Sequence, residues 1–153
     1  MTSKYNEIYS RFLMKVKDYD FFNYSEADAQ ESMRGWLTAS LSQPYLYRIF
    51  ATFSADDEIA EIEYTLTSSI NEYADKNFVE ELLGYQMVCE WLNPKVKTTT
   101  LLNQMITNSK EQKFYAQANQ LAQMRELLAD AENKVRSMLR DKGYIYNSYL
   151  GNV

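Results

Sequence analysis

The chain has 153 residues, of which 46% are hydrophobic and 24% charged, so it fits one globular domain large enough to bury a core. It contains no His and a single Cys, Cys89, which excludes His-dependent nucleophile systems and any disulfide within the chain; Cys89 itself is expected in the core. The net charge of -5 is uneven, because residues 1–90 carry 7 Lys and Arg against 16 Asp and Glu, whereas residues 91–153 carry 9 against 5. The acidic part disfavours binding to phosphate backbones, and the basic part is too dilute for a nucleic-acid patch.

Two amphipathic helices are predicted near the start of the chain. Ser3 is expected to cap the first, whose apolar positions recur every three or four residues. Ser25 and Asp28 resemble a capping box at the start of the second, and Pro44 is expected to end it. Residues 45–53 fit either a helical stripe or an extended segment, and both interpretations stay open here.

An acidic stretch and an alternating segment follow. Residues 54–58 form a polar break. After it, the apolar residues Ile62, Tyr64 and Leu66 alternate with polar ones, a period of two that predicts a short strand or an extended segment lying on the helices.

A central helix is predicted next. Asn77 and Glu80 are expected to cap it, and it should run to about Leu92 with apolar residues around most of its circumference. Gly84 lies inside it and costs about 1 kcal/mol relative to Ala, so we expect another helix to cross closely there. Pro94 is expected to terminate the helix, because Pro disfavours helix at the preceding residue.

A short helix at residues 101–106 and a long final helix complete the predicted elements. Ser109 and Gln112 fit a capping box for the final helix, which should run from Lys110 to about Lys142 and stop at Gly143. Its apolar stripe is longer than a core of this size can cover. We therefore expect the exposed part of residues 110–142 to meet another subunit.

These elements predict a mainly α fold, a compact helical bundle with a long C-terminal helix, one short extended or β segment and an extended C-terminal tail. The domain should comprise residues 1–143 and the tail residues 144–153. The tail is rich in Tyr, whereas a solvated tail would be polar. We interpret it as a docking segment that adds to a partner, the alternative being a tail folded back on its own domain. The candidate docking residues are Tyr144, Ile145, Tyr146, Tyr149 and Leu150.

Three segments resemble one protein family: YNEIYSRFLMKVKDYDF from Tyr5, GYQMVCEWLNPKV from Gly84 and KFYAQANQLAQMRELL from Lys113. The family is that of the small head–tail connector (neck or adaptor) proteins of long-tailed phages and prophages of Gram-positive bacteria. The resemblance covers most of the chain and lies in helix lengths and apolar spacings. It implies a mainly helical protein that forms a ring below the portal vertex, extends the DNA tunnel and offers a platform to the next neck protein.

The resemblance also implies partners and a location. The partners would be copies of the chain in a ring (a dodecamer is one candidate), the portal protein and the next neck or tail protein, with double-stranded DNA passing through unbound. The protein would be made in the host bacterial cytoplasm and lie in the neck of the virion. An acidic wall lowers phosphate affinity, so we expect part of the acidic stretch to line the tunnel, the alternative being a solvated acidic loop. The candidate lining residues are Asp56, Asp57, Glu58, Glu61 and Glu63.

Two alternatives come from other functional classes. The pairs Glu58/Glu61 and Glu72/Asp75 would cage Mg²⁺ if they lay on antiparallel helices, as in the all-α nucleoside triphosphate pyrophosphohydrolases. The gap between the pairs is short for two helices and a turn, and no Lys or Arg cluster lies nearby. We therefore expect no catalytic, cofactor or metal site. The other alternative is a helical adaptor without a virion role. No apolar run approaches the roughly 20 residues that span a bilayer, so no membrane is expected.

Overall fold

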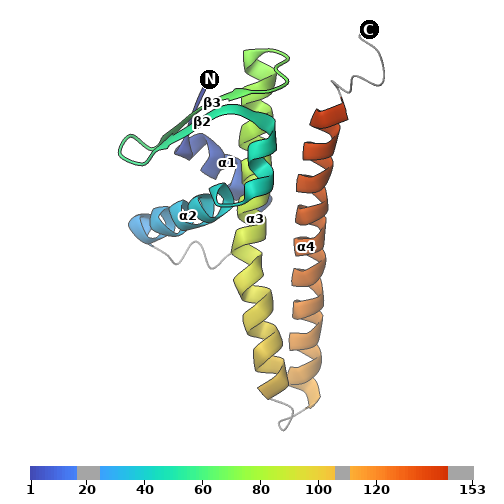
Figure 1. The fold of residues 1–153 in the computed structure, drawn as a ribbon. Helices are drawn as coiled ribbons and strands as arrows, with labels where there is room; N and C mark the ends of the chain where they lie inside the picture. Colours follow the sequence, from blue (N-terminus) through green and yellow to red (C-terminus); the bar gives the residue numbers. More distant parts are fainter. Residues whose placement is uncertain (17–24, 106–110, 145–153) are drawn as a thin grey trace.

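The computed structural model describes the backbone of residues 1–16, 25–105 and 111–144, and the side chains of residues 1–16, 25–98 and 118–143. Within these residues the fold is mainly α with one small sheet, which confirms the predicted class (Figure 1). The elements in chain order are β1 (Thr2–Lys4), α1 (Tyr5–Lys15), α2 (Glu26–Leu41), the 3-10 helix η2 (Pro44–Ile49), β2 (Phe50–Asp56), β3 (Glu61–Leu66), α3 (Glu72–Met105) and α4 (Glu111–Tyr144).

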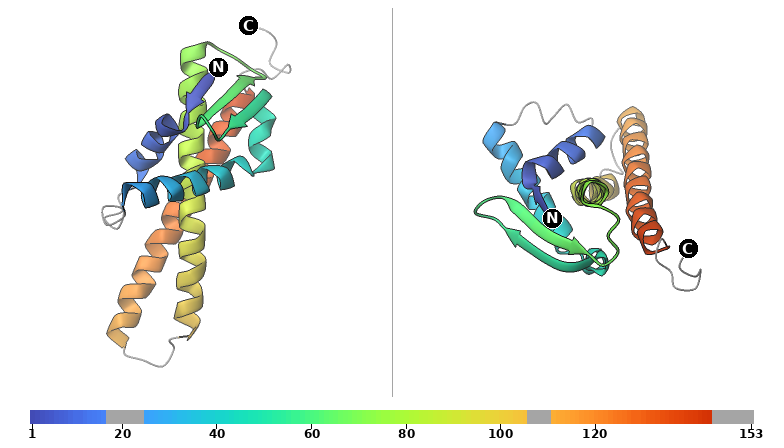
Figure 2. Two further views of the ribbon diagram at one scale, coloured as in Figure 1. Left: turned by 90° about the vertical axis from the view of Figure 1, so that its left-hand side faces the viewer. Right: turned by 90° about the horizontal axis from the view of Figure 1, so that it is seen from above.

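Helix α3 is the axis of the molecule. It packs against α4 along one side and against α1 and α2 on the other, and the sheet covers its N-terminal half (Figures 1 and 2). A helix surrounded in this way must be apolar around its circumference, as the sequence predicted. The largest fully buried side chains come from most of the elements: Ile8, Phe12, Leu37, Leu46, Ile62, Tyr64, Val79, Leu82, Leu83, Met87, Leu92 and Val135.

The close helix crossing predicted at Gly84 is confirmed. A Cβ placed on Gly84 would lie 2.9 Å from Cβ of Arg11 and 3.3 Å from the backbone N of Phe12. Both atoms belong to α1, which therefore approaches the backbone of α3 more closely than any larger residue would allow. Around this crossing the rings of Trp36 and Trp91 pack on Phe12, with centroids 5.4 and 6.3 Å away.

The sheet has three antiparallel strands in the order β1-β3-β2. The predicted strand at Ile62–Leu66 is confirmed as β3, whose apolar side chains are buried against the helices. The sheet is larger than the single extended segment that was predicted. Residues 45–53 divide between η2 and β2, and the polar break begins only after Asp56, because residues 54–56 pair with β3.

The prediction that Ser3 caps the first helix is wrong. Ser3 lies in β1 opposite Ile62, and its buried Oγ lies 3.0 Å from the hydroxyl of Tyr64 and donates to Oε1 of Glu80 at 3.1 Å. Because Ser3 pairs with β3 in the sheet, it does not serve as the N-cap for which its residue type is suited. By contrast, the cap at Ser25 is confirmed, since its Oγ accepts a hydrogen bond from the backbone N–H of Asp28 at 3.2 Å.

Both predicted ends of the central helix are wrong. Helix α3 starts at Glu72, where Oδ1 of Asn71 accepts the N–H of Ala74 at 2.8 Å, and Asn77 lies inside the helix. It also continues through Pro94 to Met105, so the predicted short helix at 101–106 is the end of α3, with residue 106 outside the described part. Pro94 removes one helical hydrogen bond, and the packing of α3 along α4 offsets that loss.

The long final helix is confirmed as α4, and Gly143 lies one residue before its end rather than after it. The predicted cap at Ser109 lies outside the described residues. Leu121, Ala131 and Val135 of the predicted stripe are buried. Beyond the level at which α1 and α2 pack, α3 and α4 continue together as a two-helix arm (Figures 1 and 2). No helix in the described part of the chain is long and apolar enough to cross a bilayer.

Candidate assembly surfaces

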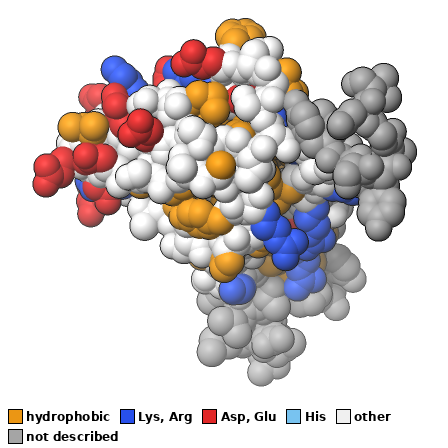
Figure 3. All heavy atoms as spheres, turned by 45° about the horizontal axis from the view of Figure 1, so that its top comes forward, with side chains coloured by type: hydrophobic (Ala, Val, Ile, Leu, Met, Phe, Trp, Pro, Cys, Tyr) orange, Lys and Arg blue, Asp and Glu red, His pale blue; other side chains and the backbone are white. Residues whose placement is uncertain are grey.

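The predicted acidic residues gather at the free end of the β2–β3 hairpin. Asp56 ends β2 directly opposite Glu61 of β3, and Glu63 lies opposite Ser54 two pairs further along. Glu58 lies in the turn that joins the strands. The buried alternation of β3 sends Glu61 and Glu63 to the outer face of the sheet, away from the helices. The result is a surface of carboxylates around the end of the hairpin, which Figure 3 shows in red.

Asp57 has a different role from its acidic neighbours. The hydroxyl of Tyr5 donates to its Oδ1 at 2.7 Å, and Nη2 of Arg34 lies 3.5 Å from its Oδ2. The hydrogen bond from Tyr5, more than the Arg34 charge, lowers the pKa of Asp57. Burial and the same hydrogen bond raise the pKa of Tyr5. Asp57 therefore fastens the turn to α1 and α2, and it is the acidic residue least available to a partner.

The turn itself is held by hydrogen bonds to Asp56 and carries an apolar side chain. Oδ1 of Asp56 accepts the backbone N–H of Glu58 at 2.9 Å and that of Ile59 at 3.4 Å. Ala60 adopts a left-handed conformation with φ of 54°, and its carbonyl accepts the N–H of Tyr5 at 2.9 Å. Ile59 is 65% exposed at this turn. The hairpin thus ends in an exposed isoleucine surrounded by carboxylates.

A second surface, the arginine cleft, lies between η2, α3 and α4. It has a volume of about 670 Å³ and combines three arginines with apolar and amide side chains. Its lining residues are Gln43, Tyr45, Arg48, Ile49, Gln86, Cys89, Glu90, Asn93, Glu132, Val135, Arg136, Leu139 and Arg140.

The floor of the arginine cleft is fixed by hydrogen bonds. Oε1 of Glu90 accepts from Nε2 of Gln43 and from Nε2 of Gln86, both at 2.9 Å. The hydroxyl of Tyr45 donates to Oε1 of Gln86 at 2.8 Å. Burial raises the pKa of the Cys89 thiol to about 12, so this side chain is a protonated part of the wall. These contacts hold η2 against α3 at the floor of the cleft.

The rim of the cleft carries its exposed charge. Arg48 extends from η2, and Arg136 and Arg140 extend from α4, one helical turn apart. Nη2 of Arg136 lies 3.6 Å from Oε2 of Glu132, and Nε of Arg140 lies 3.4 Å from Oδ1 of Asp141. Exposed ion pairs of this kind contribute about 1 kcal/mol or less, so both guanidinium groups can exchange these partners for an incoming anion.

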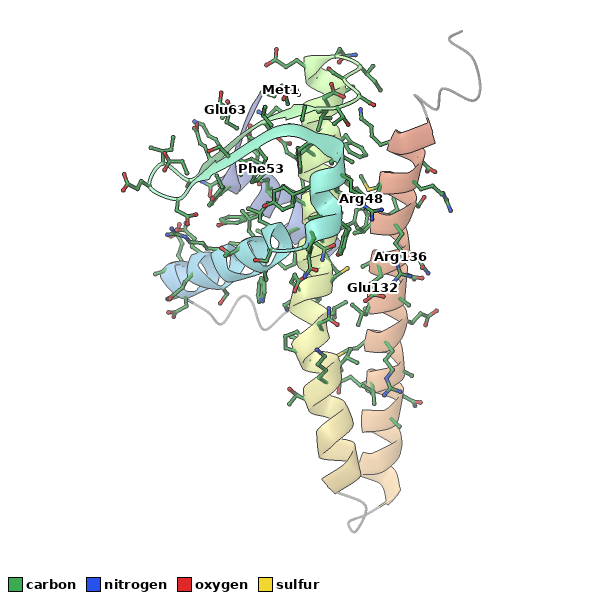
Figure 4. The ribbon with its side chains drawn as sticks, viewed as in Figure 1. Met1, Arg48, Phe53, Glu63, Glu132 and Arg136 are labelled. Atoms are coloured by element: carbon green, nitrogen blue, oxygen red, sulfur yellow. The ribbon has the colours of Figure 1, made fainter. Side chains whose placement is uncertain are left out.

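The two surfaces lie on opposite sides of the molecule. Figure 4 places Arg48 and Arg136 where η2 faces α4, and Glu63 on the sheet on the far side of α3. In Figure 3 the acidic side chains lie mainly at the left, with some Lys and Arg side chains among them, and a larger group of Lys and Arg side chains lies at the lower right. No family model, no curated protein and no solved structure matches this chain. The geometry of these surfaces therefore carries the functional argument together with the sequence resemblance.

The structure does not bring the candidate metal-binding carboxylates together on two helices. Glu58 lies in the hairpin turn and Glu61 in β3, whereas Glu72 and Asp75 lie in the first turn of α3. Asp75 is fully buried, and its Oδ1 accepts from Nζ of Lys142 at 2.8 Å. Among the described residues no group of three or more Asp, Glu or Cys side chains is arranged to hold a metal ion.

The predicted docking tail begins at the end of α4 that packs beside the start of α3 (Figure 1). Tyr144 is the last residue of α4, and its side chain lies outside the described part. Ile145, Tyr146, Tyr149 and Leu150 also lie outside it, so their docking role stays a prediction.

Sequence reasoning missed the arginine cleft. The spacing of Arg136 and Arg140, four residues apart on a predicted helix, places both on one face and was the available signal. Arg48 is far from both in sequence, and only the packing of η2 on α4 brings it to the same rim.

Proposed function

We propose that this protein is a structural subunit of the head–tail connector of a long-tailed phage or prophage. It forms a ring with copies of itself between the portal and the tail, around the path of the DNA. The resemblance of its sequence to connector proteins supports this role. The structural observation that carries the proposal is the shape of the chain, a compact body from which α3 and α4 continue as a two-helix arm (Figure 1).

The shape suits a ring subunit for a physical reason. A closed ring is built from head-to-tail contacts, so each subunit needs two different surfaces that complement each other. A projecting arm and a body with an acidic hairpin on one side and an arginine cleft on the other supply such different surfaces. Leu127, which is 56% exposed on α4, adds an apolar contact site next to the arm.

The partners follow from the same proposal. The ring contacts the portal on one side and the next neck or tail protein on the other, and double-stranded DNA passes through without specific binding. The C-terminal residues 144–153 dock on the portal, with Tyr and Leu side chains as anchors. Aromatic residues suit this task because they bury a large area at low entropic cost.

Removal of the gene from the phage or prophage tests the role. We expect the lysate to contain DNA-filled heads and separate tails, with joined particles restored by a plasmid-borne copy of the wild-type gene. Electron microscopy of the lysate measures the fraction of joined particles. Joined, infectious particles without the protein would contradict the connector role and favour the helical adaptor without a virion role.

A truncation tests the tail separately. Deletion of residues 144–153 is expected to abolish binding of the purified protein to the portal while leaving its helical content and melting temperature nearly unchanged. The matched control replaces Asn147, Ser148 and Asn152 by Ala, which keeps the length and the aromatic residues of the tail. Unchanged portal binding by the truncated chain would remove the docking role of the tail and leave the connector role to be decided by the deletion.

A further inference from the structure

The carboxylates at the end of the β2–β3 hairpin are only partly balanced by contacts within the same chain. Asp57 is engaged by Tyr5 and Arg34, but Asp56 and Glu61 lie directly opposite each other across the two strands. Like charges in opposite positions repel. Lys4 of β1 is paired with Glu61 in the sheet. A partner that brings further cations to this end would relieve the repulsion.

The arginine cleft has the chemistry that this end of the hairpin requires. Its three guanidinium groups lie on two separate elements, η2 and α4, so they flank whatever enters between them. A planar guanidinium binds a carboxylate through two parallel hydrogen bonds. Between the arginines, Ile49, Val135 and Leu139 give the cleft an apolar wall that suits an exposed aliphatic side chain.

We propose that the acidic end of the hairpin of one subunit docks in the arginine cleft of the next copy of this chain. Glu58 and Glu61 meet the arginines at the rim, and Ile59 contacts the apolar wall. The choice of a second copy as the occupant rests on the proposed ring. It is supported by the charge complementarity of the two surfaces and by their positions on opposite sides of one molecule (Figures 3 and 4).

The two positions make the contact directional. A subunit cannot place its own hairpin end in its own cleft, because β2 starts at η2, which lines the cleft, and carries that end away from α4 (Figure 1). Each copy therefore offers a hairpin to one neighbour and a cleft to the other, and repetition of this contact generates a ring when the rotation closes. In this arrangement Glu58 and Glu61 lie between subunits rather than in the DNA tunnel.

The acidic residues of the cleft set the expected strength of the contact. Glu90 is already bound by two amide groups on the floor, and Glu132 shares Arg136. One hairpin end is also much smaller than a standard interface. We therefore expect a weak, salt-sensitive contact between free subunits that becomes strong only when many copies are held together.

Cross-linking of two single-cysteine variants tests the contact. Ile59→Cys places a thiol on the hairpin and Leu139→Cys places one in the cleft, and neither substitution changes a charge. Both variants also carry Cys89→Ala, which removes the native thiol from the wall of the cleft. Mild oxidation of the two purified variants mixed together is expected to give disulfide-linked dimers, at several times the yield of either variant alone.

The matched control is Ile59→Cys mixed with Leu127→Cys, which places the second thiol on α4 outside the arginine cleft. Leu127 is more exposed than Leu139, so random collisions favour the control. The dimer yield of the test pair should exceed that of the control several-fold and fall towards it at about 1 M salt, where the Debye length is roughly 3 Å. Equal yields for the two pairs would overturn the proposal.

A charge exchange provides the second test. Glu58→Lys with Glu61→Lys on the hairpin partner, or Arg48→Glu with Arg136→Glu on the cleft partner, should each reduce cross-linking to the control level. The two reversed partners together should restore it. If a reversed hairpin variant fails to fold, Glu58→Gln with Glu61→Gln replaces it, and the expected result is a loss of yield. If the two reversed partners together give a cross-linking yield no higher than either reversed partner gives with the wild-type surface, the contact is refuted.

The cross-linking experiment and the gene deletion test the two proposals independently. Cross-linking uses purified protein and needs no virion. Failed cross-linking together with unjoined particles would remove this contact and keep the connector role. Specific cross-linking together with joined particles would keep the contact between copies and remove the connector role.

Discussion

Replacement of Gly84 by Ala is the most direct test of the packing described above. At an open helical position this change stabilises a protein by about 1 kcal/mol, because Ala has the higher helix propensity. At Gly84 the new Cβ would lie 2.9 Å from Cβ of Arg11, which the backbone of α1 holds in place. Carbon atoms prefer separations of about 3.5–4.0 Å, so α1 must move away from α3 and loosen the contacts around Phe12.

Overpacking of this kind costs about 1–3 kcal/mol, which equals or exceeds the gain of about 1 kcal/mol in helix propensity. We expect Gly84→Ala to lower the free energy of unfolding by up to about 2 kcal/mol. Gly35→Ala is the matched control, because Gly35 lies in α2 with no atom within 4 Å of its would-be Cβ. For a chain of this size 1 kcal/mol corresponds to about 2–4 °C in Tm.

Thermal and urea unfolding followed by circular dichroism measure both variants. Gly35→Ala should raise the Tm by about 2–4 °C, and Gly84→Ala should lower it by up to about twice that amount. An increase in Tm for Gly84→Ala similar to that for Gly35→Ala would refute the close crossing of α1 and α3.

Three other substitutions and one labelling experiment test other parts of the fold. Lys142→Met should cost about 3–5 kcal/mol in urea unfolding, because it leaves Asp75 buried without its cation; a loss below about 1 kcal/mol would contradict the buried pair. Burial raises the pKa of Asp75, but hydrogen bonds from Lys142, Ser69 and the backbone outweigh burial and lower it below 3.8. Its stabilisation is therefore present above about pH 4 and lost as the pH falls through the lowered pKa, a step that Asp75→Asn should lack in acid titrations of stability. Cys89 should react with a thiol reagent only as fast as the protein opens, and rapid labelling of the native protein would contradict its burial. Pro94→Ala should raise the Tm, because it restores an N–H inside α3; an unchanged Tm would indicate that the helix does not run through this position.

Local patterns predicted the elements whose structure is decided locally. The uninterrupted apolar stripe predicted α4, whose observed start at Glu111 is one residue from the expected one. The period of two at Ile62–Leu66 predicted β3, and the cap at Ser25 predicted the start of α2. Gly84 predicted a helix crossing, because a glycine inside an apolar helix needs a packing reason. In each case the signal lies within a few residues, although the helix that crosses at Gly84 is distant in the sequence.

The wrong predictions of helix caps and ends concern residues whose structure is set by long-range contacts. Ser3 and Glu80 each fit a local capping pattern, yet they hydrogen-bond to each other across 77 residues. Asn77 likewise fits a cap, but Asn71 is the residue that caps α3. Pro94 fits a terminator, but the packing of α3 on α4 keeps the helix intact. Local propensities near 1 kcal/mol are small beside a pairing of this extent, so tertiary contacts prevail.

The same distinction applies to the two candidate surfaces. Composition revealed the acidic hairpin, because its carboxylates are neighbours in the sequence. The arginine cleft was invisible, because Arg48 and Arg136 meet only after η2 has packed against α4.

The positions of the two surfaces follow from how the core is built. The bond between Tyr5 and Asp57 fixes the hairpin to α1, and the bond from Gln43 to Glu90 fixes the start of η2 to α3. The angle between hairpin and cleft is therefore a property of the folded body rather than of flexible side chains. A fixed angle between two complementary surfaces is what sets the number of subunits in a closed ring.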